Sequence, residues 1–356
     1  MPATAPLLSI GIPTYNRAEL LRLMLQSLAP EVKDLGDDVE VVVSDNCSED
    51  HTQEVIEWAR QHIPLRYRRN ERNLGSAKNI VFLPKDLAIG EFCWILGDDD
   101  MIVRGKLSKV VDILKANSGL DHICVNYFFK SIEERDFLIR ECDAVYSPHI
   151  SECMCKDTSE YHVPRWEDLL NIESCRPRAM FTYSGCHVFR RSMWCAHMGR
   201  LQLDESVDTV SRSLDTIFPH VKLLAHAMVG QPAYYVGDPS VLLGMGPKDH
   251  HEYWPLFILN CLTDAIGLYE TLGVNRRTIR RLREDHIKEC ASSLLHMLSN
   301  PTPGREDFSL RQFIWKNRKC PAALLRMFAS ISWPLARRKT ARPLRRWWSQ
   351  KRSGAL

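Results

Sequence analysis

Short apolar runs alternate with amphipathic segments over the first 130 residues of the chain. The apolar runs predict strands at residues 7–12, 39–45, 91–96 and 122–129, and residues 65–70 are expected to form a further short strand. Between them, apolar residues at helical spacing predict helices at residues 17–28, 48–61, 75–87 (interrupted near Pro84) and 105–116. Strands that alternate with helices are typical of an α/β domain built on a largely parallel sheet.

The pattern is less regular in the next hundred residues. Residues 130–165 are polar and have no clear period, which favours an excursion or a flexible loop. Residues 180–191 are expected to form a strand that returns to the sheet, and residues 213–228 a turn followed by a helix. Residues 232–245 are expected to form a closing pair of strands.

After about residue 250 the pattern becomes helical. Residues 276–298 carry apolar side chains on one expected helix face, at positions 279, 282, 287, 290, 294 and 297. The changes of pattern predict three parts: an α/β domain over residues 1–245, a helical region over residues 246–332, and a basic, tryptophan-containing tail over residues 333–356.

Composition indicates an ordinary globular protein with an unevenly distributed charge. The 356 residues are 45% hydrophobic and 26% charged, and the sequence shows neither a membrane-spanning apolar run nor a secretory signal, which favours the cytoplasm. Residues 311–356 hold 13 of the 47 basic residues and no acidic residue. The remaining residues carry 34 basic and 44 acidic groups, so an acidic body precedes a basic tail.

The basic tail suggests an anionic partner. It contains Trp333, Trp347 and Trp348, and tryptophan beside arginine suits an anionic membrane surface, although a solvated tail is the alternative. No recognition module accompanies the basic run, so nucleic acid is not expected as a partner. The 12 cysteines are scattered and favour reduced thiols, and the spacing of Cys153 and Cys155 is not that of a usual zinc site.

Polar side chains follow three of the predicted strands. Asn16, Asp45 and the triplet Asp98 to Asp100 each come directly after an apolar run, and in a parallel sheet such positions meet at one edge. The triplet lies within "WILGDDDMIV", residues 94–103, and three adjacent carboxylates repel one another. A divalent cation would relieve that repulsion, whereas a solvated acidic turn or a helix N-cap is the alternative without chemistry.

Four segments together carry a family resemblance. "IPTYNR" (12–17), "VVVSDNCSED" (41–50), "RNLGSAKN" (72–79) and "WILGDDD" (94–100) occur in an order and spacing that resembles the family 2 glycosyltransferases of the GT-A fold. The resemblance extends loosely to about residue 245. It implies a mixed, mostly parallel sheet flanked by helices with a C-terminal helical extension, a nucleotide-diphosphate sugar as donor, and Mn²⁺ or Mg²⁺ as cofactor.

The resemblance also implies roles for individual residues. Asp100 would bind the metal directly, Asp98 would face the ribose or bind the metal through water, and Asp99 is less certain. His250 is a further candidate for the metal shell, in a polar segment after the last strand. The nucleoside pocket would be formed by Pro13, the backbone of Thr14, Tyr15, Arg17 and Asp45, whose carboxylate would accept an N–H of the base.

The segment 72–79 is expected to approach the donor. Asn73 would shape the turn, Gly75 would permit a close approach, and Lys78 would attract phosphate where the family often has arginine. Simpler interpretations remain for some of these residues. Tyr15 suits a packing aromatic, Arg17 a cap of its helix, and Lys78 with Asn79 exposed positions on a helix.

The general base is harder to place, because the family's Glu-Asp pair is missing. Asp215 stands before a helix at about the expected distance and is the first candidate, with Asp208 second. The alternative is that Asp215 caps the helix that begins near Phe218. "FPH" followed by "LLAHAM" resembles a bacterial subgroup that adds dideoxyhexoses such as abequose to O-antigen, and His220 in this segment is either an acceptor or phosphate contact or a structural histidine.

The resemblance therefore implies a metal-dependent, inverting glycosyltransferase that acts on a hydroxyl of a glycan or lipid-linked acceptor. Bacterial lipopolysaccharide or O-antigen synthesis would place it at the inner face of the cytoplasmic membrane. A nucleotidyltransferase is one alternative, but "IPTYNR" is not the glycine-rich phosphate loop expected after its first strand. A non-catalytic sugar- or lipid-binding module is the other, and the intact acidic triplet disfavours it.

Overall fold

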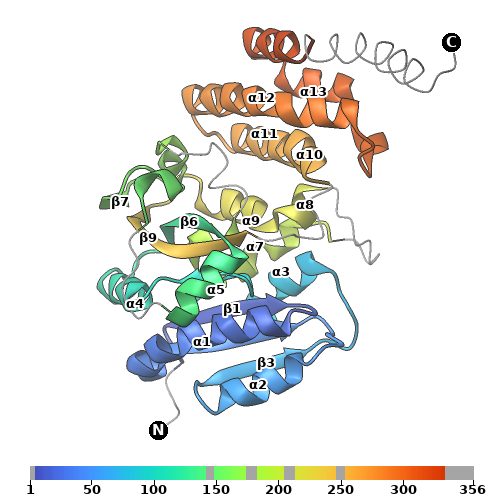
Figure 1. The fold of residues 1–356 in the computed structure, drawn as a ribbon. Helices are drawn as coiled ribbons and strands as arrows, with labels where there is room; N and C mark the ends of the chain where they lie inside the picture. The colour runs from blue at the N-terminus through green and yellow to red at the C-terminus, as the bar shows by residue number, and fades with distance from the viewer. Residues whose placement is uncertain (1–4, 142–147, 174–182, 204–212, 246–252, 333–356) are drawn as a thin grey trace, which may run out of the picture. The chain divides into compact units, whose positions relative to one another are not determined.

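The computed structural model describes residues 5–141, 148–173, 183–203, 213–245 and 253–332. The chain divides into two compact units. Unit 1 comprises Met1–Pro247 with Thr271–Val274, and unit 2 comprises Lys248–Glu270 with Asn275–Leu356. Unit 1 holds the sheet, and unit 2 is helical wherever it has regular structure that is described (Figure 1).

A mixed sheet forms the centre of unit 1. Its nine described strands are β1 (Leu8–Thr14), β2 (Val39–Asp45), β3 (Leu65–Arg69), β4 (Phe92–Ile95), β5 (Met101–Ile102), β6 (His122–Ser131), β7 (Glu160–Val163), β8 (His187–Arg190) and β9 (Ala233–Met245). The strand order is β3-β2-β1-β4-β8-β6-β9-β5, and β7 pairs with β9. Strands β3, β2, β1 and β4 are parallel, as are β6 and β9, whereas β8, β5 and β7 run antiparallel to their neighbours.

The helices of unit 1 fall into two groups. They are α1 (Ala18–Leu35), α2 (Thr52–Arg60), α3 (Ser76–Asp86), α4 (Lys106–Ala116), α5 (Ile132–Glu141), α7 (Arg191–His197), α8 (Leu214–Ile217) and α9 (Pro219–Met228). Helix α1 contacts α2, α4 and α5, whereas α3 contacts α7, α8 and α9. Strand β2 is buried along its whole length, which explains why its valines follow one another without alternation.

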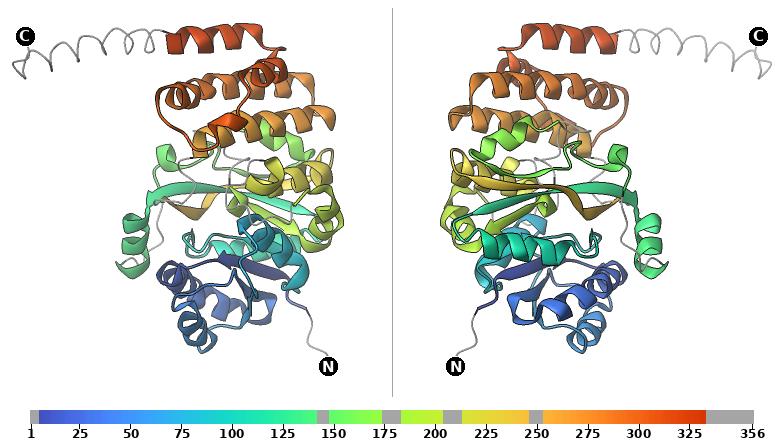
Figure 2. Two further views of the ribbon diagram at one scale, coloured as in Figure 1. Left: turned by 90° about the vertical axis from the view of Figure 1, so that its right-hand side faces the viewer. Right: turned by 90° about the vertical axis from the view of Figure 1, so that its left-hand side faces the viewer.

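Unit 2 is built around one long amphipathic helix. Its elements are α10 (Trp254–Leu256), a π-helical turn (Phe257–Leu262), α11 (Thr263–Thr271), α12 (Arg276–Ser299), α13 (Leu310–Asn317) and a further helical stretch over residues 321–332 (Figure 2). The predicted apolar face of α12 is confirmed, because all six positions are buried. In unit 2 the buried Arg283 pairs with Glu270 at 2.7 Å. No described helix is both long enough and apolar enough to cross a membrane.

The segment 232–245 contains one strand, β9 (Ala233–Met245), so the prediction of a strand pair is wrong. Strand β9 stays continuous because residues 237–240 bulge between its two paired stretches with β6. Asn126 of β6 fills the bulge and donates to the carbonyl of Gly237 at 2.8 Å and to that of Cys155 at 3.0 Å. Gly237 and Pro239 therefore mark a bulge, although in the sequence they resemble a turn.

Three further expectations need correction. The described part of residues 130–165 contains α5 and β7, although α5 is polar and its periodicity is weak. Helix α3 continues through Pro84, which lies in its last turn. In the described part of the predicted strand 180–191, only His187–Arg190 is extended. The ten described cysteines are free thiols, Cys153 and Cys155 among them.

Candidate active site

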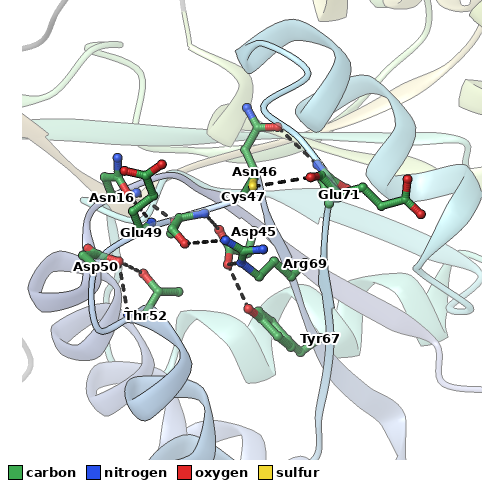
Figure 3. A network of polar contacts seen from close by, with 12 residues as sticks. Asn16, Asp45, Asn46, Cys47, Glu49, Asp50, Thr52, Tyr67, Arg69 and Glu71 are labelled. Atoms are coloured by element: carbon green, nitrogen blue, oxygen red, sulfur yellow. Dashed lines mark hydrogen bonds and ion pairs between the residues drawn. The ribbon is translucent and has the colours of Figure 1, made fainter.

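The loops that follow β1 and β2 are hydrogen-bonded to each other. Asn16 has a φ of 51°, and its backbone amide donates to Ser48 Oγ at 2.9 Å while its side-chain oxygen accepts from the Glu49 amide at 2.7 Å. Asp50 accepts from the Ala18 amide at 2.9 Å. Figure 3 shows the bond between Asn16 and Glu49 and the neighbouring polar contacts of these loops. Ser48 and Asp50 thus connect the two loops, and Asp50 also accepts from the amide of Thr52, the first residue of α2, at 3.1 Å.

Asp45 is completely buried beneath these loops. One carboxylate oxygen accepts from the Ser48 amide at 2.9 Å, and the other accepts from the hydroxyl of Tyr67 at 2.8 Å. Arg69 lies 3.8 Å from the second oxygen (Figure 3). Burial and donation to this carboxylate raise the pKa of Tyr67. A contact with a nucleotide base, the expected role of Asp45, would be shared with these protein partners.

Buried amides hold the segment that contains residues 72–79. Asn46 accepts from the Leu74 amide at 2.9 Å and donates to Asn73 at 2.7 Å, and Asn73 also accepts from the Gly75 amide at 2.8 Å. Asn79 bonds to both the hydroxyl and the carbonyl of Ser44. The alternative of an exposed Asn79 is therefore wrong, since it is buried within this network.

Gly75 and Lys78 lie in the same segment, residues 72–79. Gly75 has a φ of 81°, a backbone conformation that by itself favours glycine, and a Cβ there would meet no protein atom within 4 Å. Lys78 is half-buried, and none of the described carboxylates pairs with it. Pro13 is likewise half-buried, and Tyr15 is exposed at 41%.

Arg17 is the neutralising group that the structure places beside the acidic triplet. Its guanidinium lies 3.1 Å from Asp98 and 3.5 Å from Asp99. The hydroxyl of Thr14 donates to Asp98 at 2.8 Å, so the role of Thr14 includes its side chain as well as its backbone. Burial raises the pKa of Asp98, and the charge of Arg17 opposes that rise. Arg17 also precedes the first residue of α1, but its side chain makes no capping bond there.

Asp100 is held by two donors that the sequence patterns did not identify. One of its carboxylate oxygens accepts from the phenol of Tyr183 at 2.7 Å and from the Gly97 amide at 2.7 Å. Tyr183 is buried, and a Cβ on Gly185 would lie 2.2 Å from its hydroxyl oxygen. Trp94 donates to the Gly185 carbonyl at 2.8 Å, so the strand that leads to the triplet also supports the tyrosine.

Two glycines leave space around the triplet. A Cβ on Gly97 would lie 2.7 Å from a carboxylate oxygen of Asp99 and 3.1 Å from one of Asp100, so both carboxylates bend over this glycine. A Cβ on Gly244, in β9, would lie 2.2 Å from the Asp99 carbonyl oxygen. The close approach of β9 was not predicted, because residue 244 is 145 positions away in sequence.

The triplet's oxygen donors suit a hard divalent cation. Among the described residues, no three Asp, Glu, His or Cys side chains are grouped closely enough to hold a metal by themselves. His250, the further candidate, lies outside the described residues.

Asp215 lies in the first turn of α8, away from the start of α9. Its carboxylate accepts from Lys222 at 2.6 Å and lies 3.3 Å from the Gln202 amide nitrogen. The cap position before α9 is Phe218, so Asp215 does not cap that helix. Helix α8 packs on α3, which carries Lys78 and Asn79. Asp208 lies outside the described residues.

His220 belongs to a row of three buried histidines. The ring of His187 lies 5.9 Å from that of His220, and its Nδ1 lies 3.0 Å from Nε2 of His122. Burial and the neighbouring His187 lower the pKa of His122 well below its usual value. This placement favours the structural interpretation of His220.

Comparisons with known proteins agree with the family resemblance of the sequence motifs. The family model described as glycosyl transferase family 2 matches residues 9–194. The abequosyltransferase RfbV of Salmonella typhimurium is 27% identical over 253 residues, which cover 69% of this chain and 68% of that protein. A β-1,3-glucosyltransferase of Campylobacter jejuni, named for GalNAc(5)-diNAcBac-PP-undecaprenol, is 33% identical over 123 residues, which cover 34% of this chain and 38% of that protein.

A solved structure shares the fold. The crystal structure of residues 1–349 of Staphylococcus aureus TarS in complex with UDP superimposes with a TM-score of 0.50. It is 18% identical, and the match covers 93% of this chain and 91% of that chain. The GT-A fold expected from the sequence is thereby confirmed, with the sheet mixed and the C-terminal helices present.

Proposed function

The chain belongs to glycosyl transferase family 2 and is a glycosyltransferase, and from that premise we propose that it moves a sugar from a nucleotide-diphosphate donor to a hydroxyl of a glycan or lipid-linked acceptor. The observation that carries this proposal is the buried triplet Asp98 to Asp100, bordered by Arg17 at the carboxyl ends of parallel strands. Ligands of α/β sheets bind at such an edge.

The donor would lie between the loops after β1 and β2 and the start of α3. Tyr15 offers an exposed ring for a nucleoside, and Asp45 a buried carboxylate at the bottom of the loops. Lys78 supplies a positive charge without a described acidic partner, which suits a diphosphate. The UDP complex named for TarS supports a nucleotide donor of this class.

Asp98 and Asp100 would hold a divalent cation, Mn²⁺ or Mg²⁺. When bound, the cation neutralises charge on the departing diphosphate as a Lewis acid. The chain's own contribution is to fix the carboxylates beforehand, through Thr14 and Arg17 on Asp98 and through Tyr183 on Asp100. Preorganised charges of this kind avoid a reorganisation cost during the reaction.

Asp215 is proposed as the general base of an inverting transfer. The acceptor oxygen would attack the anomeric carbon of the donor sugar, and the bond between that carbon and the diphosphate oxygen would break. The proton of the acceptor hydroxyl would pass to Asp215. Its ion pair with Lys222 would equally serve to join α8 and α9. Asp208 remains the second candidate.

Bacterial surface polysaccharide synthesis, such as that of lipopolysaccharide or O-antigen, is the proposed setting. The names of the matched proteins from Salmonella and Campylobacter support it, since one is an abequosyltransferase and the other is named for a lipid-linked acceptor. An acceptor of this kind would place the enzyme at the inner face of the cytoplasmic membrane, with residues 333–356 as a basic contact.

A donor screen tests the proposal. The purified chain would be incubated with Mn²⁺ and UDP-, GDP-, CDP- or dTDP-sugars, and release of the nucleoside diphosphate would be measured. Hydrolysis of one donor class is expected, and Asp100→Ala should abolish it while circular dichroism stays unchanged. Pyrophosphate release from a nucleoside triphosphate would instead indicate a nucleotidyltransferase. Tight donor binding without turnover would indicate a non-catalytic module, and full activity of Asp100→Ala with chelator present would exclude the metal role.

A further inference from the structure

Helix α13 exposes large apolar side chains beside and opposite its packed face. Phe313 and Asn317 are buried four residues apart and mark the inner side of this helix. Leu310, Ile314 and Trp315 are exposed, and Trp315 retains 63% of its accessible surface. At 100° per residue Trp315 lies about 160° from Phe313 around the helix, whereas Ile314 and Leu310 lie about 100° and about 60° from it, on the flank beside Asn317.

Two arginines lie on the exposed side of α13. Arg311 and Arg318 are exposed and lie between the apolar positions in angle. The guanidinium of Arg318 lies 3.8 Å from the ring centroid of Trp315. Lys316, on the other flank of the helix, pairs with Asp264 at 2.5 Å. In the part of the chain that the structure describes, no carboxylate pairs with Arg311 or Arg318.

The next helical stretch, residues 321–332, repeats this composition. Leu325 retains 72% of its accessible surface, and Ala322 and Ala329 are exposed on the same side. Arg326 is exposed beside them. From Phe308 to Ser332 the sequence contains five basic residues and no acidic residue.

We propose that the exposed residues Leu310, Arg311, Ile314, Trp315, Arg318, Leu325 and Arg326, here called the basic apolar surface, dock unit 2 on an anionic membrane surface. Arginines attract anionic headgroups, while tryptophan and leucine enter the boundary between headgroups and acyl chains. This deepens the proposed function by naming a partner for unit 2, but vesicle binding can be measured without transfer activity.

The charge distribution distinguishes a membrane from a second copy of the chain. Two identical surfaces that carry only arginines as charged groups would repel each other across a symmetric interface. An anionic bilayer supplies the opposite charge and also accepts apolar side chains without a matching pocket. The surface therefore suits lipid better than self-association.

Co-sedimentation of the full-length chain with vesicles tests the proposal. The vesicles would contain phosphatidylcholine alone or with one quarter phosphatidylglycerol, at low and at 0.5 M salt. Arg311→Gln/Arg318→Gln should lower the partition coefficient on anionic vesicles about 30-fold at low salt, since each arginine near the surface contributes about 1 kcal/mol. Trp315→Ser/Leu325→Ser should lower it about ten-fold or more at high salt, where charge attraction is screened.

Matched controls separate this surface from general charge or apolar content. Leu298→Ser changes another exposed leucine of unit 2, 42% exposed on α12, and should bind as the unaltered chain does. Arg276→Gln/Arg277→Gln removes two exposed arginines from the start of α12. It should lower binding far less than Arg311→Gln/Arg318→Gln.

Three results would overturn the proposal. The first is that the two surface variants bind vesicles as well as their controls do. The second is equal binding of the unaltered chain to neutral and anionic vesicles. The third is that the surface variants change from dimer to monomer on gel filtration without a change in vesicle binding. Donor hydrolysis in solution should be unchanged in all variants. A catalytically dead Asp100→Ala chain should still bind vesicles, so failure of the proposed function and failure of the docking surface can be told apart.

Discussion

Tyr183 donates a hydrogen bond of 2.7 Å to Asp100, and both side chains are buried. The phenol and the Gly97 amide share one carboxylate oxygen, which fixes the rotamer of Asp100. Tyr183→Phe keeps the ring but removes the donor, so we expect Mn²⁺ affinity in the presence of nucleoside diphosphate to fall about ten-fold. Electron paramagnetic resonance titration of free Mn²⁺ would measure this directly.

Tyr161→Phe provides the matched control, because it also removes a phenol that donates to an aspartate, Asp157, at 3.0 Å. It should leave Mn²⁺ affinity unchanged. If both variants lose the same affinity, the effect of Tyr183 is general destabilisation and the positioning role is wrong.

Arg17 should make the triplet less dependent on added cations for stability. Arg17→Met removes the charge beside Asp98 and Asp99, and we expect a loss of about 1–3 kcal/mol in the free energy of unfolding. Mn²⁺ should then raise the melting temperature more in this variant than in the unaltered chain. Arg22→Met, which removes an exposed partner of Glu19, is the control in the same thermal scans. An equal Mn²⁺ effect in all three proteins would contradict the prediction.

The two roles open to Asp215 predict different kinetics. As the general base, its replacement in Asp215→Asn should lower kcat about 10²–10⁴-fold with little change in the donor KM. Lys222→Met breaks the same ion pair but keeps the carboxylate, so its kcat should stay within about ten-fold of normal. Comparable kcat losses in both variants, accompanied by lower melting temperatures, would assign Asp215 to packing of α8 and α9.

The buried histidine row should make the protein less stable in mild acid. Because the pKa of His122 is lowered in the folded state, only the unfolded chain gains its proton as the pH falls below about 6.5. The stability of the unaltered chain relative to His122→Asn should therefore fall by up to about 1.4 kcal/mol per pH unit below that value. Urea unfolding at pH 7.5, 6.5 and 5.5 measures the difference. Equal changes of stability with pH in the unaltered chain and in His122→Asn would contradict the prediction.

Local patterns predict the first 130 residues well because most strands there are followed by an amphipathic helix, although the two-residue strand β5 is too short to leave a pattern. The buried valines of β2 and the single apolar face of α12 each contain enough local information to be identified. Strand β9 was misinterpreted because a side chain from another strand, Asn126, stabilises its bulge. Such a contact leaves no local trace in sequence.

The candidate site shows the same limit. The acidic triplet and its neighbours after β1 and β2 are recognisable because they follow apolar strands. The groups around them are not recognisable in the sequence. The donor Tyr183 is 83 residues from Asp100. The reason for a glycine at position 244 becomes evident only from the short distance to the Asp99 backbone. Arg17 was assigned to the nucleoside or to its helix, and only the folded chain brings it to Asp98.

Strand β9 has a practical consequence for anyone who shortens this protein. The family model ends at residue 194, yet β9 begins at Ala233 and pairs with β5, β6 and β7. A fragment cut at the end of the family match would expose three strand edges and open the space behind Asp99, and exposed edges promote aggregation. The smallest piece worth expressing therefore extends beyond Met245, well past the region by which the family is recognised.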